Sequence, residues 1–363
     1  MKLNLDTAEL AKKLEGIQMK QVVAAALALL AVLFLLPLLL LGQTPSEETE
    51  ESPAPTGGLP LDRTVITPTV TEDGKTTVNV KLDDGEVVAL PLDKYLWRVV
   101  AAEMPASFEL EALKAQAVAA RTYTLTKMGR TTENHPDADV CTDITCCQAY
   151  LAPETAAANW GSMADTYTEK ITAAVAGTDT MTALYDGVPI QALFFSSAAG
   201  QTVDAVEVWG NSVPYLISVD SPEGEDDVPN YHTTVTVPLE EFKTKLLSRY
   251  AEANLSGPPE TWVSTLVSST GSRANVDVGG VVVARTALRA MFGLRSANFT
   301  VSAGEDGMTF SVTGYGHGVG MSQYGANALA RQDMTYDEIL KWYYTGIEVA
   351  PYSPQQSDSS SHD

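Results

Sequence analysis

The chain has 363 residues and a formal net charge of −23, because 46 Asp and Glu outnumber 23 Lys and Arg. Such an acidic surface repels a phosphate backbone, so the composition excludes a nucleic-acid-binding protein. Three cysteines are too few for a disulfide framework in a chain of this size. The length is sufficient for one large domain or two, with a substantial hydrophobic core.

The first recognisable element is an uncharged apolar run of twenty residues from Val22 to Leu41, long enough to cross a bilayer as a helix. Three lysines lie shortly before it and no basic residue follows before Arg63, which predicts a cytoplasmic N-terminus and an exported remainder. A cleaved signal peptide is the alternative, but no small-x-small site follows the run. We therefore expect residues 1–21 in the cytoplasm, an uncleaved single-pass anchor at 22–41 and an extracytoplasmic domain at the cell membrane.

Residues 42–62 are rich in Pro, Ser, Thr, Glu and Gly and contain few apolar side chains. This composition buries too little surface to fold, so it predicts a flexible linker. Residues 63–350 should form the folded domain, and the polar residues 351–363 should form a disordered tail.

Short strand and helix signals alternate within the folded domain. Asp84-Gly85 and Asp186-Gly187 each separate two apolar runs, which predicts hairpins over residues 77–90 and 181–195. The pattern predicts an α+β fold of mainly antiparallel sheets packed with a helical group around a cleft, preceded by the transmembrane helix. We expect residues 204–262 to form a second lobe. Further helices are expected at about 165–176, 239–251, 287–292, 322–331 and 335–343, and further strands at 235–237, 262–267, 274–278, 281–285 and 308–314.

The most informative stretch is residues 96–126, with Glu103 at its centre. Pro105 restricts Met104 and cannot continue a helix, so the preceding helix should end at or near Glu103. Ser107 is the expected N-cap of the alanine-rich helix that follows. A carboxyl at this corner between apolar side chains should be partly desolvated, which raises its pKa and lets it hold a proton near neutral pH. A solvated glutamate at a helix end is the alternative.

Small residues surround two further candidates for a binding wall. Ser196 and Ser197 end the second hairpin in small side chains that leave space for a ligand. Glycines alternate at positions 314, 316, 318 and 320 around His317, without the lysine of a P-loop or the spacing of a dinucleotide fingerprint. His317 is therefore either a substrate-binding side chain or a residue that hydrogen-bonds within a packed turn. Gln323 and Tyr324 are candidates for the same wall.

One imidazole and two thiols recur at six-residue steps in the loop after the long helix, at His135, Cys141 and Cys147. Three nitrogen and sulfur ligands with an open fourth position suit zinc. A disulfide between Cys141 and Cys147, or free thiols, is the alternative. Cys146 leaves the ligand set open, because it could replace Cys147 or serve as a fourth ligand.

Taken together, these motifs resemble the stage II sporulation protein D family of cell-wall lytic transglycosylases. Cys146 stands where relatives often carry histidine, and Ala198 and Ala199 replace more polar small residues. The resemblance rests on Ala101-Ala-Glu-Met-Pro-Ala-Ser-Phe108, Glu111-Ala-Leu-Lys-Ala-Gln-Ala-Val118, Ala120-Arg-Thr-Tyr123, Asp139-Val-Cys141, Cys147-Gln-Ala-Tyr150, Phe195-Ser-Ser, Gly200-Gln-Thr202, Val208-Trp-Gly210, Tyr215-Leu216, Asp220-Ser-Pro222 and residues 314–326.

This resemblance implies a lyase that cleaves the β-1,4 bond from N-acetylmuramic acid to N-acetylglucosamine in peptidoglycan glycan strands and leaves a 1,6-anhydro end. It implies that Glu103 is the catalytic acid and base, and that any zinc is structural. The setting would be engulfment during sporulation, in the mother-cell engulfing membrane. Two partners are implied: an amidase, stage II sporulation protein P, and a membrane scaffold, stage II sporulation protein M. The candidate substrate-binding residues are Ser196, Ser197, Tyr215, His317, Gln323 and Tyr324.

Two other functions are open at this point. The chain could be a non-catalytic peptidoglycan-binding scaffold in which Glu103 only caps a helix. It could instead be a zinc-dependent cell-wall amidase or peptidase, with His135 and the thiols as its catalytic site.

Overall fold

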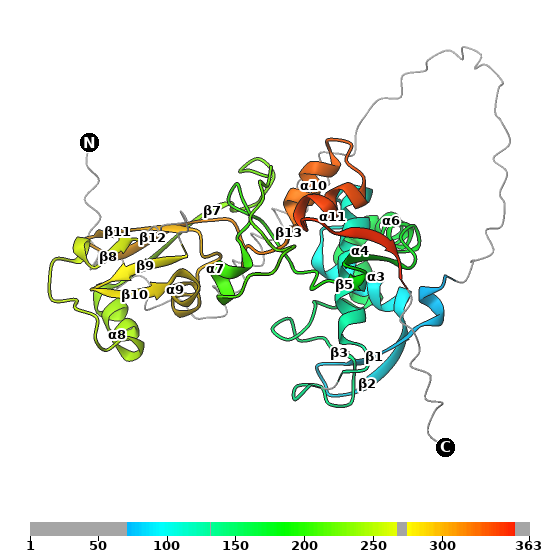
Figure 1. The fold of residues 1–363 in the computed structure, drawn as a ribbon, viewed down its shortest axis with the longest axis horizontal. Coiled ribbons are helices and arrows are strands. Elements are labelled where there is room, and N and C mark those ends of the chain that lie inside the picture. Colours follow the sequence, from blue (N-terminus) through cyan, green and yellow to red (C-terminus); the bar gives the residue numbers. More distant parts are fainter. Residues whose placement is uncertain (1–70, 131, 267–273, 353–363) are drawn as a thin grey trace, which may run out of the picture. The chain divides into compact units, whose positions relative to one another are not determined.

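The computed structural model describes residues 71–130, 132–266 and 274–352 (Figure 1). The expected anchor at 22–41, the linker at 42–62 and all but the first two residues of the expected tail lie outside these ranges. Among the helices that are described, none combines the length and the apolar character needed to cross a bilayer.

The described residues form a mixed α+β fold, as expected. The helices are α3 (Leu92–Glu103), α4 (Leu110–Lys127), α5 (Pro153–Trp160), α6 (Ala164–Ala176), α7 (Ala205–Trp209), α8 (Leu239–Arg249), α9 (Arg285–Phe292), α10 (Gln323–Ala330) and α11 (Tyr336–Tyr343). The strands are β1 (Thr77–Lys81), β2 (Val87–Pro91), β3 (Val140–Cys141), β4 (Met181–Tyr185), β5 (Val188–Pro189), β6 (Phe194–Phe195), β7 (His232–Val237), β8 (Val263–Thr265), β9 (Asn275–Val278), β10 (Val281–Ala284), β11 (Phe299–Gly304), β12 (Gly307–Thr313), β13 (Met321–Ser322) and β14 (Glu348–Pro351).

Most strand pairs among the described residues are antiparallel; the first expected hairpin is present, and the second is present only as far as Pro189, because residues 194–195 pair with β13. Strand β1 pairs with β2, with Val80 opposite Val88, and β4 pairs with β5 through the Asp186-Gly187 turn. The two parallel pairs are short: β3 adds to β1, and β13 pairs with β6. Because β6 and β13 are far apart in the sequence, this second pair joins the end of the second hairpin to the glycine-rich segment.

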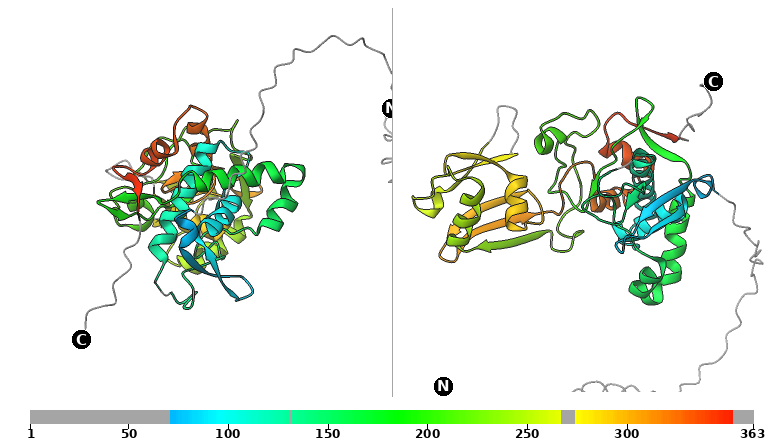
Figure 2. Two further views of the ribbon diagram at one scale, coloured as in Figure 1. Left: turned by 90° about the vertical axis from the view of Figure 1, so that its right-hand side faces the viewer. Right: turned by 90° about the horizontal axis from the view of Figure 1, so that it is seen from below.

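Helix α4 is the centre of the helical group. Helices α3, α6, α10 and α11 all pack against it, as Figures 1 and 2 show. Leu113, Ala117 and Ala120 are fully buried, and so is the guanidinium-bearing Arg121. The Nε atom of Arg121 donates to Asp73 at 2.8 Å and its Nη1 atom donates to the Met181 carbonyl at 3.0 Å. This buried ion pair ties the start of the described chain to the central helix.

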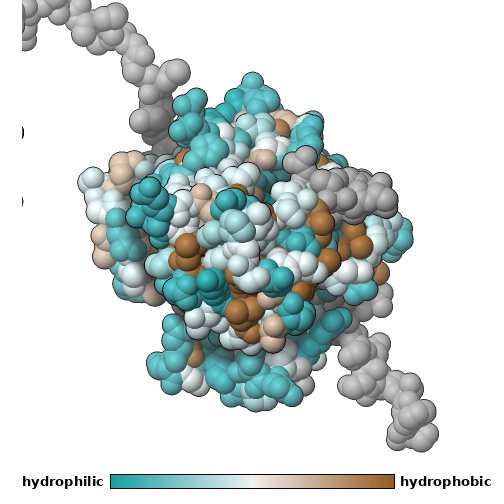
Figure 3. All heavy atoms as spheres, turned by 90° about the vertical axis from the view of Figure 1, so that its left-hand side faces the viewer, coloured by the Kyte–Doolittle hydropathy of each residue, from teal (hydrophilic) through white to brown (hydrophobic). Residues whose placement is uncertain are grey.

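A second hydrophobic cluster is formed by β7 to β12 with α8 and α9. Its buried residues run from Val237 to Val312, and the rings of Phe242, Phe292 and Phe310 pack together at its centre. The expected second lobe at 204–262 therefore has the wrong bounds. The reason is strand pairing, because β7 pairs with β12, which follows it by about seventy residues. Ala205 and Leu216 are instead buried in a separate hydrophobic cluster, the one that contains α3 and α4. Figure 3 shows hydrophobic residues as small areas among hydrophilic ones on the face it views.

The expected N-cap at Ser107 is also wrong. Helix α4 begins at Leu110 with Glu109 at its N-cap, and no side chain caps it. The backbone N–H of Glu109 instead donates to Asn327 Oδ1 at 2.8 Å. A residue of α10 therefore satisfies a helix-end donor that a local cap usually satisfies.

Candidate active site

Glu103 is the last residue of α3. The next residue, Met104, leaves the helix with φ −117° and ψ 143°, which is the extended conformation that a following proline imposes. The carboxyl group therefore lies at the corner between α3 and α4, as the sequence predicted.

Two donors hold this carboxyl group. The backbone N–H of Ala149 donates to Glu103 Oε1 at 2.8 Å, and Gln323 Nε2 donates to Oε2 at 3.2 Å. Burial raises the pKa of Glu103 above its ordinary value, and the two hydrogen bonds oppose the rise because they favour the charged form. The group thus holds its proton to a higher pH than an exposed glutamate does, and its anion still has two partners.

The wall beside Glu103 comes from α10 and the end of β6. Gln323 is the first residue of α10, and Ser322 caps that helix by accepting a hydrogen bond from the Gly325 N–H. The N–H of Tyr324 donates to the Ser196 carbonyl at 3.0 Å. Three of the expected residues, Ser196, Gln323 and Tyr324, are therefore brought together at this wall.

A buried carboxylate that sequence reasoning missed lies behind the wall. Glu223 accepts from the Ala198 N–H at 2.6 Å, from Ser221 Oγ at 2.5 Å, and from Ser322 Oγ. It thereby joins the segment after β6 to the N-cap of α10. In the sequence it is one acid among several in the segment 215–229, and only its position directly after Pro222 sets it apart.

The glycine-rich segment is fixed by backbone hydrogen bonds on both sides. Tyr315 exchanges N–H···O bonds with Ser197, and the Gly316 N–H donates to the Arg295 carbonyl. Gly320 has φ +83°, and a Cβ there would collide with the Leu193 carbonyl. The backbone approaches here are closer than any larger residue would allow.

Both ring nitrogens of His317 form hydrogen bonds within the protein. Its Nδ1 accepts from the Val319 N–H at 3.2 Å, and its Nε2 donates to the Phe194 carbonyl at 3.1 Å. The proton therefore lies on Nε2, and burial lowers the pKa of the ring so that it stays neutral at neutral pH. This arrangement fits the packed-turn alternative for His317.

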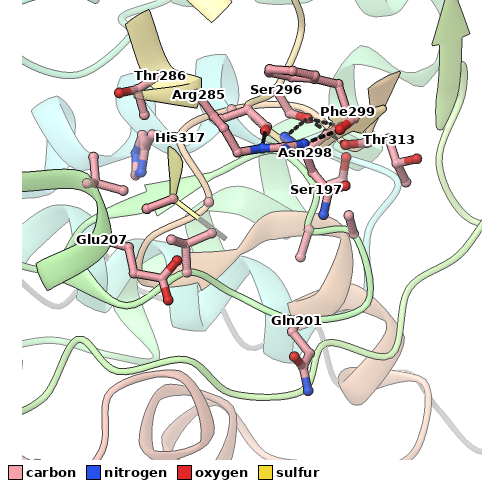
Figure 4. A pocket seen from close by; sticks show the side chains of 18 of the residues that line it. Ser197, Gln201, Glu207, Arg285, Thr286, Ser296, Asn298, Phe299, Thr313 and His317 are labelled. Atoms are coloured by element: carbon pink, nitrogen blue, oxygen red, sulfur yellow. Dashed lines mark hydrogen bonds between the residues drawn. The ribbon is translucent and has the colours of Figure 1, made fainter. Parts of the chain in front are cut away.

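A cavity of about 260 Å³ lies beside the same segment (Figure 4). Ser197 and His317 line it, and the Ser197 hydroxyl is buried without a hydrogen-bond partner. Arg285 donates to the carbonyls of Ala297 and Phe299 on one side, and Figure 4 shows Glu207 away from that hydrogen-bonded group.

Tyr215 lies elsewhere. Its hydroxyl accepts from the Gln191 N–H at 3.1 Å and its ring packs on Tyr185, with 5.5 Å between ring centroids. None of its described contacts involves Glu103 or the α10 wall, so the structure does not bring this expected residue into contact with the acid.

The expected metal ligands converge, and Cys146 joins them. The ligand atoms of His135, Cys141, Cys146 and Cys147 all lie within 4.8 Å of one another, and the three cysteines are not in disulfides. Cys147 Sγ lies 3.4 Å from His135 Nε2 and 3.9 Å from Cys146 Sγ. Tetrahedral zinc with Zn–S bonds near 2.3 Å needs sulfurs about 3.8 Å apart, so the four groups fit one zinc ion.

The surroundings of the cluster also fit a metal site. His135 Nδ1 donates to the Ala138 carbonyl at 2.9 Å, which leaves Nε2 free to bind a metal. If all four groups bound one ion, they would fill the fourth position that the sequence left open. Ala149, which holds Glu103, follows Cys147 by two residues, so the cluster is directly linked to the acid.

Comparison with known proteins agrees with these observations. A family model described as stage II sporulation protein matches residues 83–185. Stage II sporulation protein D of Bacillus subtilis (strain 168) is 33% identical over 92% of this chain and 96% of its own length, and that of Bacillus amyloliquefaciens is 35% identical over 78% and 81%. The amidase enhancer of Bacillus subtilis is 31% identical over 70% of this chain and 40% of its own length. The chain thus belongs to the stage II sporulation protein D family.

Proposed function

We propose that the chain is a lytic transglycosylase that cleaves the N-acetylmuramic acid to N-acetylglucosamine bond of peptidoglycan glycan strands. The observation that carries this proposal is the environment of Glu103. Its carboxyl is protonated more readily than usual because of burial, and the donors Ala149 and Gln323 stabilise the anion left after proton transfer. A group that is stable enough in both protonation states can act first as an acid and then as a base.

The reaction needs only one carboxyl group. Protonated Glu103 donates its proton to the glycosidic oxygen as the bond to the anomeric carbon breaks. The resulting carboxylate accepts the proton of the 6-hydroxyl group of the N-acetylmuramic acid. The oxygen of that hydroxyl group bonds to the anomeric carbon of the same sugar and closes the 1,6-anhydro ring. No water is consumed, whereas hydrolytic glycosidases use a second carboxylate to activate water or to form a covalent intermediate.

The relatives support a role in the cell wall during sporulation. Two of them carry the name stage II sporulation protein D and a third is named an amidase enhancer. We infer from this that the chain acts on the wall with an amidase, and we propose stage II sporulation proteins P and M as partners on the family resemblance alone. The expected anchor at 22–41 would keep it at the outer surface of the mother-cell membrane.

We propose a structural zinc ion bound by His135, Cys141, Cys146 and Cys147. Catalytic zinc sites keep a position for water, whereas four protein ligands leave none. The closed ligand set therefore argues against a zinc-dependent amidase or peptidase. When bound, zinc would crosslink the loop that presents the Ala149 N–H to Glu103.

Glu103→Gln tests the function directly, since glutamine keeps the shape of the side chain but cannot transfer a proton. Full-length wild-type protein should release products from glycan strands that are about 18 Da lighter than hydrolysis products, because no water is added. The variant should bind the strands and release these products at least about 10²-fold more slowly. Equal product release by both proteins, or strand binding without products by the wild type, would reject the transglycosylase in favour of another enzyme or of a scaffold.

A further inference from the structure

Two arginines, Arg295 at the ring of Tyr315 and Arg289 hydrogen-bonded to the Arg295 carbonyl, lie outside the contacts already described for Glu103. Arg295, three residues beyond α9, has its guanidinium carbon 4.1 Å from the centroid of that ring. Arg289, on α9, donates from Nε to the Arg295 carbonyl. Burial lowers the pKa of Arg289, and the phenol of Tyr315 opposes that shift, so the guanidinium stays charged at neutral pH.

Neither arginine has a carboxylate partner among the described residues. This is unexpected in a chain with twice as many acidic as basic residues. Both side chains are half-buried, and the Nε atom of Arg295 is buried without a hydrogen-bond partner. A cation that is partly removed from water and not paired is unfavourable, which points to an anionic ligand.

The geometry at Tyr315 leaves donors for such a ligand. Stacking on an aromatic ring uses the face of a guanidinium, whereas the N–H groups point outward in its plane. A carboxylate accepts two of these parallel donors at once. Tyr315 is 44% exposed as a residue, so a ligand can approach the stacked pair from solvent.

The two cations lie along the same wall as the catalytic acid. Burial raises the pKa of Tyr324, and the positive charge of Arg295 opposes that rise. Tyr324 directly follows Gln323, which donates to Glu103. The backbone of Tyr315 also pairs with Ser197, next to the Ser196 carbonyl that Tyr324 binds.

We propose that Arg295 and Arg289 bind a carboxylate of the glycan strand while Glu103 acts on a nearby glycosidic bond, an inference that rests on the proposed function. N-acetylglucosamine carries no charge. N-acetylmuramic acid carries a lactyl group, which ends in a free carboxylate when the stem peptide is absent and in an amide when it is present. Stem peptides carry carboxylates of their own. Both sources offer the same chemistry to the arginines.

This inference is tested by measuring the binding of fluorescently labelled strands to the full-length chain in detergent. Every protein compared also carries Glu103→Gln, so that the strands are not cleaved during the measurement. The ligands are glycan strands without stem peptides, the same strands with them, and uncharged N-acetylglucosamine oligomers. Arg295→Gln should weaken binding of at least one of the two kinds of strand about tenfold or more, Arg289→Gln should weaken it less, and Arg295→Lys should restore part of the loss. Binding of the uncharged oligomers should not change.

Arg249→Gln is the matched control, because Arg249 is exposed on α8, lies 5.8 Å from the ring of Tyr250, and also lacks an ion pair among the described residues. It should leave all three affinities unchanged. A loss limited to peptide-free strands would identify the lactyl carboxylate, and a loss limited to peptide-bearing strands would identify the stem peptide. Both results support the proposal.

Unchanged affinity of Arg295→Gln for both kinds of strand, or an equal loss for the uncharged oligomers, would overturn the inference while the proposed function stands. Arg289→Gln gives a second answer if Arg295→Gln does not fold. If the chain with native Glu103 releases no anhydro products from either kind of strand, the proposed function itself fails, which is a separate result.

Discussion

Two effects act on the ionised form of the Glu103 carboxyl group. Burial disfavours the anion, whereas hydrogen bonds from the Ala149 backbone N–H and the Gln323 side chain favour it. The balance leaves its pKa raised, so the ionised side chain destabilises the folded state at neutral pH. Proteins commonly retain such unfavourable groups at functional sites. Stability and activity should therefore respond in opposite directions to the same substitution.

Glu103→Gln should lower turnover by about 10²- to 10⁴-fold and raise the melting temperature at pH 7. In the wild type the native state binds more protons than the unfolded state between the ordinary pKa of 4.5 and the raised value, so stability falls as pH rises through that window. Below it both side chains are neutral, and the difference should vanish. Thermal melts across this pH range would measure the difference in melting temperature between the two proteins. A variant that is less stable than the wild type at pH 7 would contradict the prediction.

Gln323→Met should raise the pKa of Glu103 further, because it removes a donor that favours the anion. The acid then stays protonated to a higher pH, so the fall in activity at high pH should move upward. Gln332→Met, at an exposed glutamine just after α10, should leave the profile unchanged. A pH–rate profile that is the same for all three proteins would show that Gln323 does not tune the acid.

The residues of the site differ in how far the sequence could predict them. Glu103 could be placed at a helix end because Pro105 has a strong local effect. The His135 and Cys147 pair could be found from ligand type and spacing. Glu223 could not, because its partners Ala198 and Ser322 are distant in the sequence and its own surroundings resemble any acidic loop. Whether His317 faces a ligand or the protein also depended on Phe194, a long-range partner.

At the level of elements, α10 packs so closely that one of its positions admits only glycine. A Cβ on Gly325 would lie 2.5 Å from both Glu223 Oε2 and Ser221 Oγ, and would collide with the Tyr343 hydroxyl. Gly325→Ala should therefore destabilise the fold by about 1–3 kcal/mol, although alanine is the better helix former by about 1 kcal/mol. Gly304→Ala, where a Cβ meets nothing within 4 Å, is the control. Chemical denaturation measures the free energy of unfolding of both variants. A Gly325→Ala variant that is more stable than the wild type would refute the packing argument.

The loop that contains the four metal ligands should depend on zinc for its order. Removal of zinc by a chelator should lower the melting temperature and turnover together, because Ala149 follows Cys147 closely and holds Glu103. Cys146→Ser should weaken zinc binding, since it removes one of four ligands. Metal analysis, melting curves and turnover on the same samples would test this. Lost turnover with unchanged melting would instead indicate a catalytic metal.

Elements with strong local signals were predictable, and elements that depend on pairing were not. The hairpin at Asp84-Gly85 and the helix α6 follow from turn residues and apolar spacing. Strand β11 was missed although Phe299, Val301 and Ala303 alternate along it and pack on the second cluster, because two of these three side chains are only partly buried. The expected bounds of the second lobe were wrong because the second cluster depends on the pairing of β7 with β12, which are far apart in the sequence.

At the level of the whole molecule, the expected anchor determines where the activity can act. The full-length chain should stay in the membrane fraction through high-salt washes, because a twenty-residue apolar helix is held by lipid and not by charge. A chain that lacks residues 1–62 should remain in the aqueous fraction. Fractionation with an antibody against the folded domain would show this, and release of the full-length chain by salt alone would argue against a membrane span.

Strand β13 pairs with β6 and brings Ser322 beside Phe195, segments that lie far apart in the sequence. One of the two donors to Glu103 therefore comes from near the C-terminal end of the chain. A ribosome has to complete almost the entire polypeptide before that donor exists. An unfinished or proteolytically shortened chain that ends before Gln323 lacks one of the two donors to Glu103, so we expect the proposed activity only once synthesis has passed Gln323.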